Sequence, residues 1–197
     1  MIHSVNQLVW FGGSMEIERE SLRIYTIIAG FLVLASYAWG VSRLSKPTDL
    51  WGGVTPLMQK VNVAFMLLAA IGYLIYWWIV LFQISASDVA NLRWPWSDSD
   101  GHGGGRLLLA FSIFLIPSML WLESAALHMR NPSSFTPVLV IGVLFLASVG
   151  NVMLGLLAYS ALQDGVNGAG WMLFGTIALS IQCILNDLII WSWKFPW

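Results

Sequence analysis

Residues 135–160 read FTPVLVIGVLFLASVGNVMLGLLAYS. They lie within a longer stretch, from Asn131 to Gln163, that contains no charged side chain. A helix must present about 20 mainly apolar residues to cross roughly 30 Å of hydrocarbon. The stretch therefore predicts a transmembrane α-helix, and with it an all-α integral membrane protein.

Four further stretches fit the same description, each bounded by charged residues and turn residues. Together with the first, the predicted helices cover about residues 22–43, 61–84, 106–128, 135–160 and 171–193. Pro and Gly cluster between them, as in Lys46-Pro47 and in Asn131-Pro132, which is typical of loops. We therefore expect about five transmembrane helices in a single membrane domain that comprises residues 1–197.

The composition favours the same class of protein. The chain is 58% hydrophobic and 10% charged, whereas a soluble domain has about 25% charged residues. Its net charge of −1 gives no reason to expect nucleic acid as a partner. The single cysteine, Cys183, excludes an intrachain disulfide and a cysteine-based metal site.

Sequence patterns that hold cofactors are missing. No Lys lies inside a predicted span, and His3, His102 and His128 lie outside the spans or at their ends. Residues 101–105 are rich in glycine but are not followed by the Lys-Ser/Thr pair of a phosphate-binding loop. We expect no cofactor and no bound metal. Membrane lipids are the expected partners, and other membrane subunits are a further option.

The first 21 residues form either a solvated tail or a short interfacial helix. Ser14 suits a helix N-cap, and Glu16 and Glu18 suit the positive end of a helix dipole. The start lacks the pattern of a cleavable signal peptide or a transit peptide, so we expect Met1 to be the mature start.

The distribution of basic residues near the span ends predicts the orientation. The first loop, the third loop and the C-terminus carry Arg43, Lys46, Lys60, Arg130 and Lys194, and the opposite side carries Arg19, Arg23, Arg93 and Arg106. The difference is small. It favours an outer N-terminus and an inner C-terminus.

The first and third spans share a pattern that suggests an internal repeat. Ser36, Trp39 and Ser42 align with Ser118, Trp121 and Ser124. Each set is spaced i, i+3, i+6 and so forms one stripe on a helix. A repeat of two spans returns the chain to the same side, which predicts two parallel two-helix repeats, spans 1–2 and 3–4, followed by a fifth helix.

Two carboxylates fall inside or at the edge of the predicted spans. Glu123 precedes Arg130 by seven residues, and Asp187 precedes Lys194 by the same number. The two helices run in the same direction, so the acids are predicted to lie at a similar depth. A charged acid at mid-helix costs about 2.5–3.5 kcal/mol on insertion scales, so each is expected to face protein or water.

Further polar side chains accompany these acids. Ser124 and Asn186 adjoin them, His128 lies near the end of its span, and Asn151 and Gln182 lie near mid-span. One interpretation is a polar binding cavity between spans 3, 4 and 5, lined by Glu123, Ser124, His128, Asn151, Gln182, Asn186 and Asp187. The other is that these groups only fix helix packing, with amide pairs that contribute about 0.6 kcal/mol each.

Three functions are compatible with these patterns. The chain could bind or translocate a small solute, a proton or a lipid through the polar cavity. It could be a non-catalytic assembly or accessory subunit of a larger membrane complex. It could be a lipid-modifying enzyme that uses Glu123, Asp187 and His128 as acid–base groups. A sideways opening with His128 near either acid would favour the enzyme, and a solidly packed bundle would favour the subunit.

Overall fold

A computed structural model describes residues 18–197, and these residues form helices and loops without a strand. The helices are α1 (Arg19–Ser42), η1 (Pro47–Trp51), α2 (Pro56–Trp78), η2 (Ile79–Gln83), α3 (Ala86–Asn91), α4 (Gly103–Arg130), α5 (Thr136–Gln163), α6 (Ala169–Ser180), η3 (Ile181–Trp191) and α7 (Ser192–Lys194). Segments η2 and η3 are π-helical and continue α2 and α6. The proposed interfacial helix in the first 21 residues falls mostly on residues 1–17, outside the described residues.

Five helical rods are long and apolar enough to cross a membrane. They cover Arg19–Ser42, Pro56–Gln83, Gly103–Arg130, Thr136–Gln163 and Ala169–Lys194. The prediction of about five apolar helices is confirmed, and each rod lies over one predicted span.

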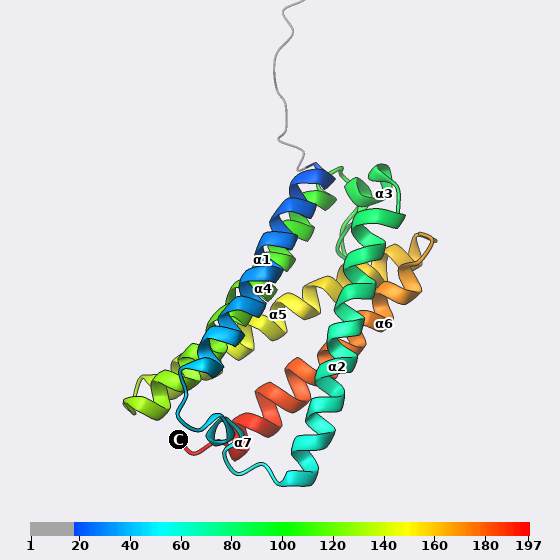
Figure 1. The fold of residues 1–197 in the computed structure, drawn as a ribbon. Coiled ribbons are helices and arrows are strands. Elements are labelled where there is room, and N and C mark those ends of the chain that lie inside the picture. The colour runs from blue at the N-terminus through cyan, green and yellow to red at the C-terminus, as the bar shows by residue number, and fades with distance from the viewer. Residues whose placement is uncertain (1–17) are drawn as a thin grey trace, which may run out of the picture.

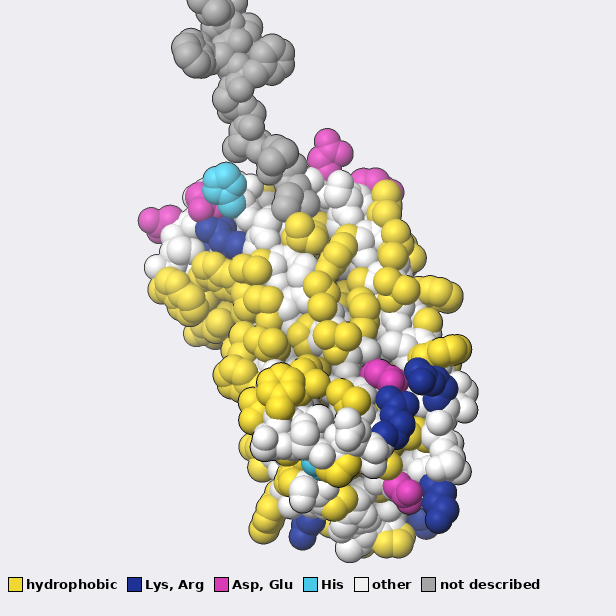
Figure 2. Space-filling view, turned by 90° about the vertical axis from the view of Figure 1, so that its left-hand side faces the viewer, with side chains coloured by type: hydrophobic (Ala, Val, Ile, Leu, Met, Phe, Trp, Pro, Cys, Tyr) yellow, Lys and Arg dark blue, Asp and Glu magenta, His cyan; other side chains and the backbone are white. Residues whose placement is uncertain are grey.

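The rods alternate in direction, so the bundle has two ends (Figure 1). The N-side end holds the start of α1 and the loops that follow η2 and α5. The C-side end holds the loops that follow α1 and α4, together with the C-terminus. Figure 2 shows a broad hydrophobic band on one face, with charged side chains gathered toward the two ends. This distribution is the one a bilayer would select.

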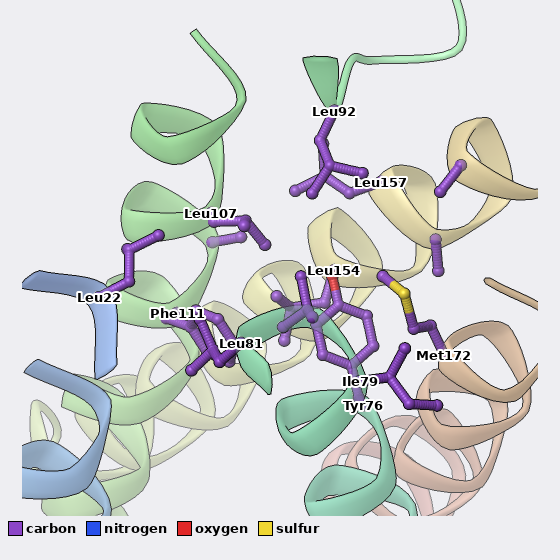
Figure 3. Close-up of a cluster of buried hydrophobic side chains, with 14 of the residues drawn as sticks. Leu22, Tyr76, Ile79, Leu81, Leu92, Leu107, Phe111, Leu154, Leu157 and Met172 are labelled. Carbon is purple, nitrogen blue, oxygen red and sulfur yellow. The ribbon is translucent and has the colours of Figure 1, made fainter. Parts of the chain in front are cut away.

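The helices pack unevenly around the bundle. α4 lies against both α5 and α1, and α6 lies against α2 and α5. The buried core of the N-side half includes Tyr76, Phe111, Leu154 and Met172, which come from four different helices (Figure 3). In contrast, α1 and α2 have no extended backbone contact, so they diverge from each other.

Two arginines of α1 complete the hydrogen bonding of η2. Arg23 Nε donates to the carbonyl oxygen of Leu81 at 2.8 Å, and Arg19 Nη1 donates to that of Ile84 at 2.6 Å. Carbonyls at the end of a helix lack partners within the helix, and a cation also suits the negative end of its dipole. These bonds tie the start of α1 to the end of the α2–η2 rod.

The predicted repeat finds no support in this packing. In the second hairpin, α4 and α5 are in extended contact, whereas α1 and α2 in the first hairpin are not. Trp39 is 63% exposed, while its counterpart Trp121 is partly buried and packs against other aromatic rings. The internal repeat therefore stays a prediction from the sequence.

Candidate functional site

A cavity of about 730 Å³ separates α1 from α2, with walls from α4 and η3. Along α1 it extends from Thr26 to Val41, a rise of about 22 Å at 1.5 Å per residue. Most of its lining side chains are apolar. Ligand pockets of small molecules typically measure about 300–1,000 Å³, so the cavity is large enough for one.

The cavity opens sideways, toward the outer surface of the bundle. Three of its lining residues on α1, Ile27, Phe31 and Leu34, are also 54%, 70% and 68% exposed. Leu74 on the facing side of α2 lines the cavity as well and is 57% exposed. Because these side chains contribute to both surfaces, they form the rim of an opening between α1 and α2.

A hydrogen bond crosses the bundle at each end of the cavity. On the N-side, Trp77 Nε1 of α2 donates to Thr26 Oγ1 of α1 at 2.8 Å. On the C-side, Trp191 Nε1 donates to the carbonyl oxygen of Leu50 at 2.7 Å. These bonds join α1 to α2 at the N-side end of the cavity and η3 to η1 at its C-side end.

A hydrogen-bonded network forms the polar part of the wall. Gln182 Nε2 donates to Asn62 Oδ1 at 3.0 Å and to Asp187 Oδ1 at 2.8 Å. Asn186 Nδ2 donates to Gln182 Oε1 at 3.2 Å. Asn62, Gln182 and Asp187 line the cavity. Polar side chains inside an apolar bundle are costly unless they are paired, and here Gln182 links all the others.

The π-helical geometry of η3 places this wall. Cys183, Asp187 and Trp191 all line the cavity and recur every fourth residue. In a π-helix the backbone bonds join residues i and i+5, so Gln182 and Asp187 lie close enough for their side chains to bond. π-Helical segments inside α-helices occur frequently at functional sites.

Glu123, the second predicted carboxylate, lies elsewhere. It accepts a hydrogen bond from Arg130 Nη2 at 2.7 Å, and Arg43 Nη1 lies 3.6 Å from the same oxygen. Its side chain is 43% exposed, and it does not line the cavity. Glu123 therefore links the ends of α1 and α4 at the C-side surface.

His128 and Ser124 also have partners outside the cavity. The imidazole of His128 is buried; its Nδ1 lies 2.7 Å from Thr136 Oγ1 and its Nε2 lies 3.2 Å from the carbonyl oxygen of Pro196. Ser124 Oγ donates to the carbonyl oxygen of Trp121 within its own helix at 2.7 Å. These contacts hold the C-terminal residues and the end of α4, and they do not place His128 beside either acid.

Asn151 joins α5 to α6. Its Nδ2 donates to Ser180 Oγ at 2.7 Å and to the carbonyl oxygen of Thr176 at 3.3 Å. Its Oδ1 is buried and has no partner among the residues that the structure describes. Asn151 therefore contributes to helix packing, apart from the cavity.

Sequence reasoning did not single out Asn62. It lies two residues after Lys60, at the edge of the predicted second span, where an amide is unremarkable. Nothing in its local pattern indicates that it meets Gln182, which is 120 residues away.

The N-side loops carry two bidentate ion pairs. Arg93 Nε and Nη2 donate to the carboxylate of Asp164 at 2.9 and 2.8 Å, and Arg106 donates twice to Asp100 at 2.8 and 2.7 Å. The hydrogen bonds from Arg93 lower the pKa of Asp164, and those from Arg106 lower the pKa of Asp100. Both pairs fix the loop between η2 and α4.

Residues 18–197 include no group of three His, Cys, Asp or Glu side chains that could hold a metal ion. No protein-family model, curated protein or solved structure matches the chain.

Proposed function

We propose that the chain is a multi-pass membrane protein that binds a small amphiphilic molecule in the lateral cavity between α1 and α2. The observation that carries the proposal is the cavity itself, a mostly apolar space of about 730 Å³ with one polar wall. Such a pocket suits a molecule with an apolar body and a polar end. The sideways opening suits entry from the hydrocarbon region of a bilayer.

Binding is favoured over passage across the membrane. The bonds of Trp77 to Thr26 and of Trp191 to Leu50 bridge the two ends of the cavity, which favours a pocket over a passage. The basic residues at the C-side end support the orientation with the C-terminus inside.

The other two functions receive less support. A lipid-modifying enzyme built on Glu123, Asp187 and His128 would need these groups around one substrate, but Glu123 contacts arginines and His128 contacts Thr136 and Pro196. An accessory subunit has no need of a cavity of this volume, and a solidly packed bundle would suit it better.

The proposal can be tested with Nile red, a neutral apolar dye, and protein in phosphatidylcholine nanodiscs. Gly30 lines the cavity, and a Cβ at this position meets no atom within 4 Å. Gly30→Phe should therefore fill the pocket without disturbing the backbone. Gly142 on α5 also has open space around it but lies away from the cavity, so Gly142→Phe is the matched control.

We expect saturable dye fluorescence above that of empty nanodiscs for the wild type and for Gly142→Phe, and at least a tenfold weaker affinity for Gly30→Phe. Absence of saturable binding to the wild type, or equal affinities for the two variants, would overturn the proposal.

A further inference from the structure

The C-side half of the cavity combines a carboxylate with a wall of aromatic rings. Tyr37 of α1 packs edge-to-face on Trp121 of α4, with ring centroids 6.0 Å apart. Trp121 packs in the same way on Trp191 of η3 at 5.8 Å. All three rings line the cavity together with Asp187, which precedes Trp191 by four residues on the same stripe of η3.

The Asp187 carboxylate has no cationic partner. It forms no ion pair within residues 18–197, and neither Lys nor Arg lines the cavity. Gln182 donates one hydrogen bond to Oδ1, and the other oxygen receives none from the described residues. A carboxylate in an apolar setting is stabilised by a nearby positive charge. The cavity thus holds a carboxyl group with no cationic partner among its lining residues, a place that a cationic ligand would fill.

The aromatic rings of the cavity also favour a cationic ligand. The faces of Trp and Tyr rings attract cations that lie within about 6 Å of the ring centroid, and aromatic cages recognise quaternary ammonium groups in this way. Tyr37, Trp121 and Trp191 come from three different helices, and the fold brings them into the lining of the cavity that Asp187 also lines.

Resting on the binding function proposed above, we infer that the occupant is a lipophilic monocation, an amine or quaternary ammonium with an apolar body, whose charged end lies between Asp187 and the rings of Tyr37, Trp121 and Trp191. The apolar body would lie toward Phe31, Leu34 and Leu74 at the opening. An anionic amphiphile would be repelled by Asp187. The phosphate of a zwitterionic lipid would find no basic residue in the lining.

A matched pair of probes tests this inference. 1-Adamantylamine and 1-adamantanol share one apolar body, but only the amine is a cation at neutral pH. Their affinities can be measured by displacement of Nile red from protein in phosphatidylcholine nanodiscs, with empty nanodiscs correcting for partition into lipid. We expect wild-type protein to bind the amine at least tenfold more tightly than the alcohol.

Three variants test whether Asp187 and the aromatic rings cause the preference for the amine. Asp187→Asn should remove the difference between amine and alcohol, with both affinities compared with that variant's own affinity for Nile red. Trp121→Leu should reduce the affinity for the amine several-fold more than the affinity for the alcohol. Trp39→Leu is the control, because Trp39 is exposed on α1 and does not line the cavity.

The two proposals fail in different ways. Equal affinity of the wild type for amine and alcohol, with Nile red still bound, would overturn the monocation inference and leave the binding function intact. The monocation inference also fails if Asp187→Asn keeps the full preference for the amine. Loss of Nile red binding by the wild type would overturn the binding function itself. The wild-type comparison needs no variant, so a poorly folding variant does not affect it.

Discussion

The crossing of α2 and α6 depends on two glycines, and replacing Gly72 with Ala should destabilise the bundle. A Cβ at Gly72 would lie 2.7 Å from the carbonyl oxygen of Gly175 and 3.1 Å from the Cβ of Ala178. Ordinary van der Waals contact begins at about 3.4 Å, so the helices would have to separate by about 0.7 Å, the difference between 3.4 and 2.7 Å. The obstructing atom is part of the backbone, so it cannot rotate away.

The expected change in the free energy of unfolding of Gly72→Ala is the balance of two effects. Overpacking of a close contact costs about 1–3 kcal/mol, and Ala gains about 0.5–1 kcal/mol over Gly in a helix interior. The free energy of unfolding of Gly72→Ala should therefore fall by up to about 2.5 kcal/mol. Gly142→Ala gains the helix term without the clash, because no atom lies within 4 Å of a Cβ there. It should be neutral or more stable by up to about 1 kcal/mol.

Both variants can be compared with the wild type by reversible unfolding in mixed micelles, with increasing SDS and circular dichroism as the readout. The order of stability should be Gly142→Ala, then wild type, then Gly72→Ala. If Gly72→Ala equals or exceeds Gly142→Ala, α2 and α6 do not approach each other this closely. A shift of α2 would also separate Asn62 from Gln182. Gly72→Ala should therefore lose affinity for Nile red as well as stability, whereas Gly142→Ala should lose neither.

Three further predictions concern topology, the loops and the core. A Cys at Ser99 and one at Ser133 should be labelled by an impermeant thiol reagent from opposite sides of the membrane; labelling of both from one side would remove a span. Because Arg93 lowers the pKa of Asp164 below its ordinary value of 3.8, the pair stabilises the fold above that pH, and the stabilisation is lost as the pH falls through the lowered pKa. Asp164→Asn should thus be less stable than wild type at pH 6, and the difference should shrink in thermal unfolding scans as the pH falls below 3.8 through the lowered pKa of Asp164. Asn151→Leu removes hydrogen bonds that contribute about 0.6 kcal/mol each, but it also removes a buried oxygen without a partner. The variant should therefore change the free energy of unfolding by less than about 1.5 kcal/mol and leave dye binding unchanged. A larger loss of stability would reveal a partner for that oxygen.

The number and approximate bounds of the helices could be predicted because a helix that can cross hydrocarbon needs a certain length and composition, and five stretches of the sequence have them. The position of the cavity could not. Side chains such as Phe31 and Leu74 look alike in sequence whether they face lipid, a neighbouring helix or a ligand. Only the divergence of α1 from α2 makes them the rim of a pocket. The sequence predicts a polar cavity between spans 3, 4 and 5, whereas the cavity in the structure lies mainly against spans 1, 2, 3 and 5.

The equal spacing of Glu123 and Asp187 from the next basic residue illustrates the same limit. Both acids precede a basic residue by seven positions, yet Arg130 bonds Glu123 at 2.7 Å and Lys194 forms no ion pair with Asp187 in the described part of the chain. Along an α-helix, seven residues make about two turns and bring the two side chains to one face. Asp187 lies in a π-helix, where this spacing no longer brings the pair to one face.

The π-helix also explains why Gln182 takes a central place in the site. Spacing of i, i+4 predicts a shared face for Gln182 and Asn186, and these side chains are bonded. The i, i+5 bond from Gln182 to Asp187 has no counterpart in regular α-helical geometry and depends on the wider turn of η3. Gln182 therefore holds Asp187 from one side while Asn62 of α2 holds Gln182 from the other. If η3 were regular α-helix, the Asp187 side chain would turn away from this amide, and the hydrogen bond that fixes it in the cavity wall would be lost.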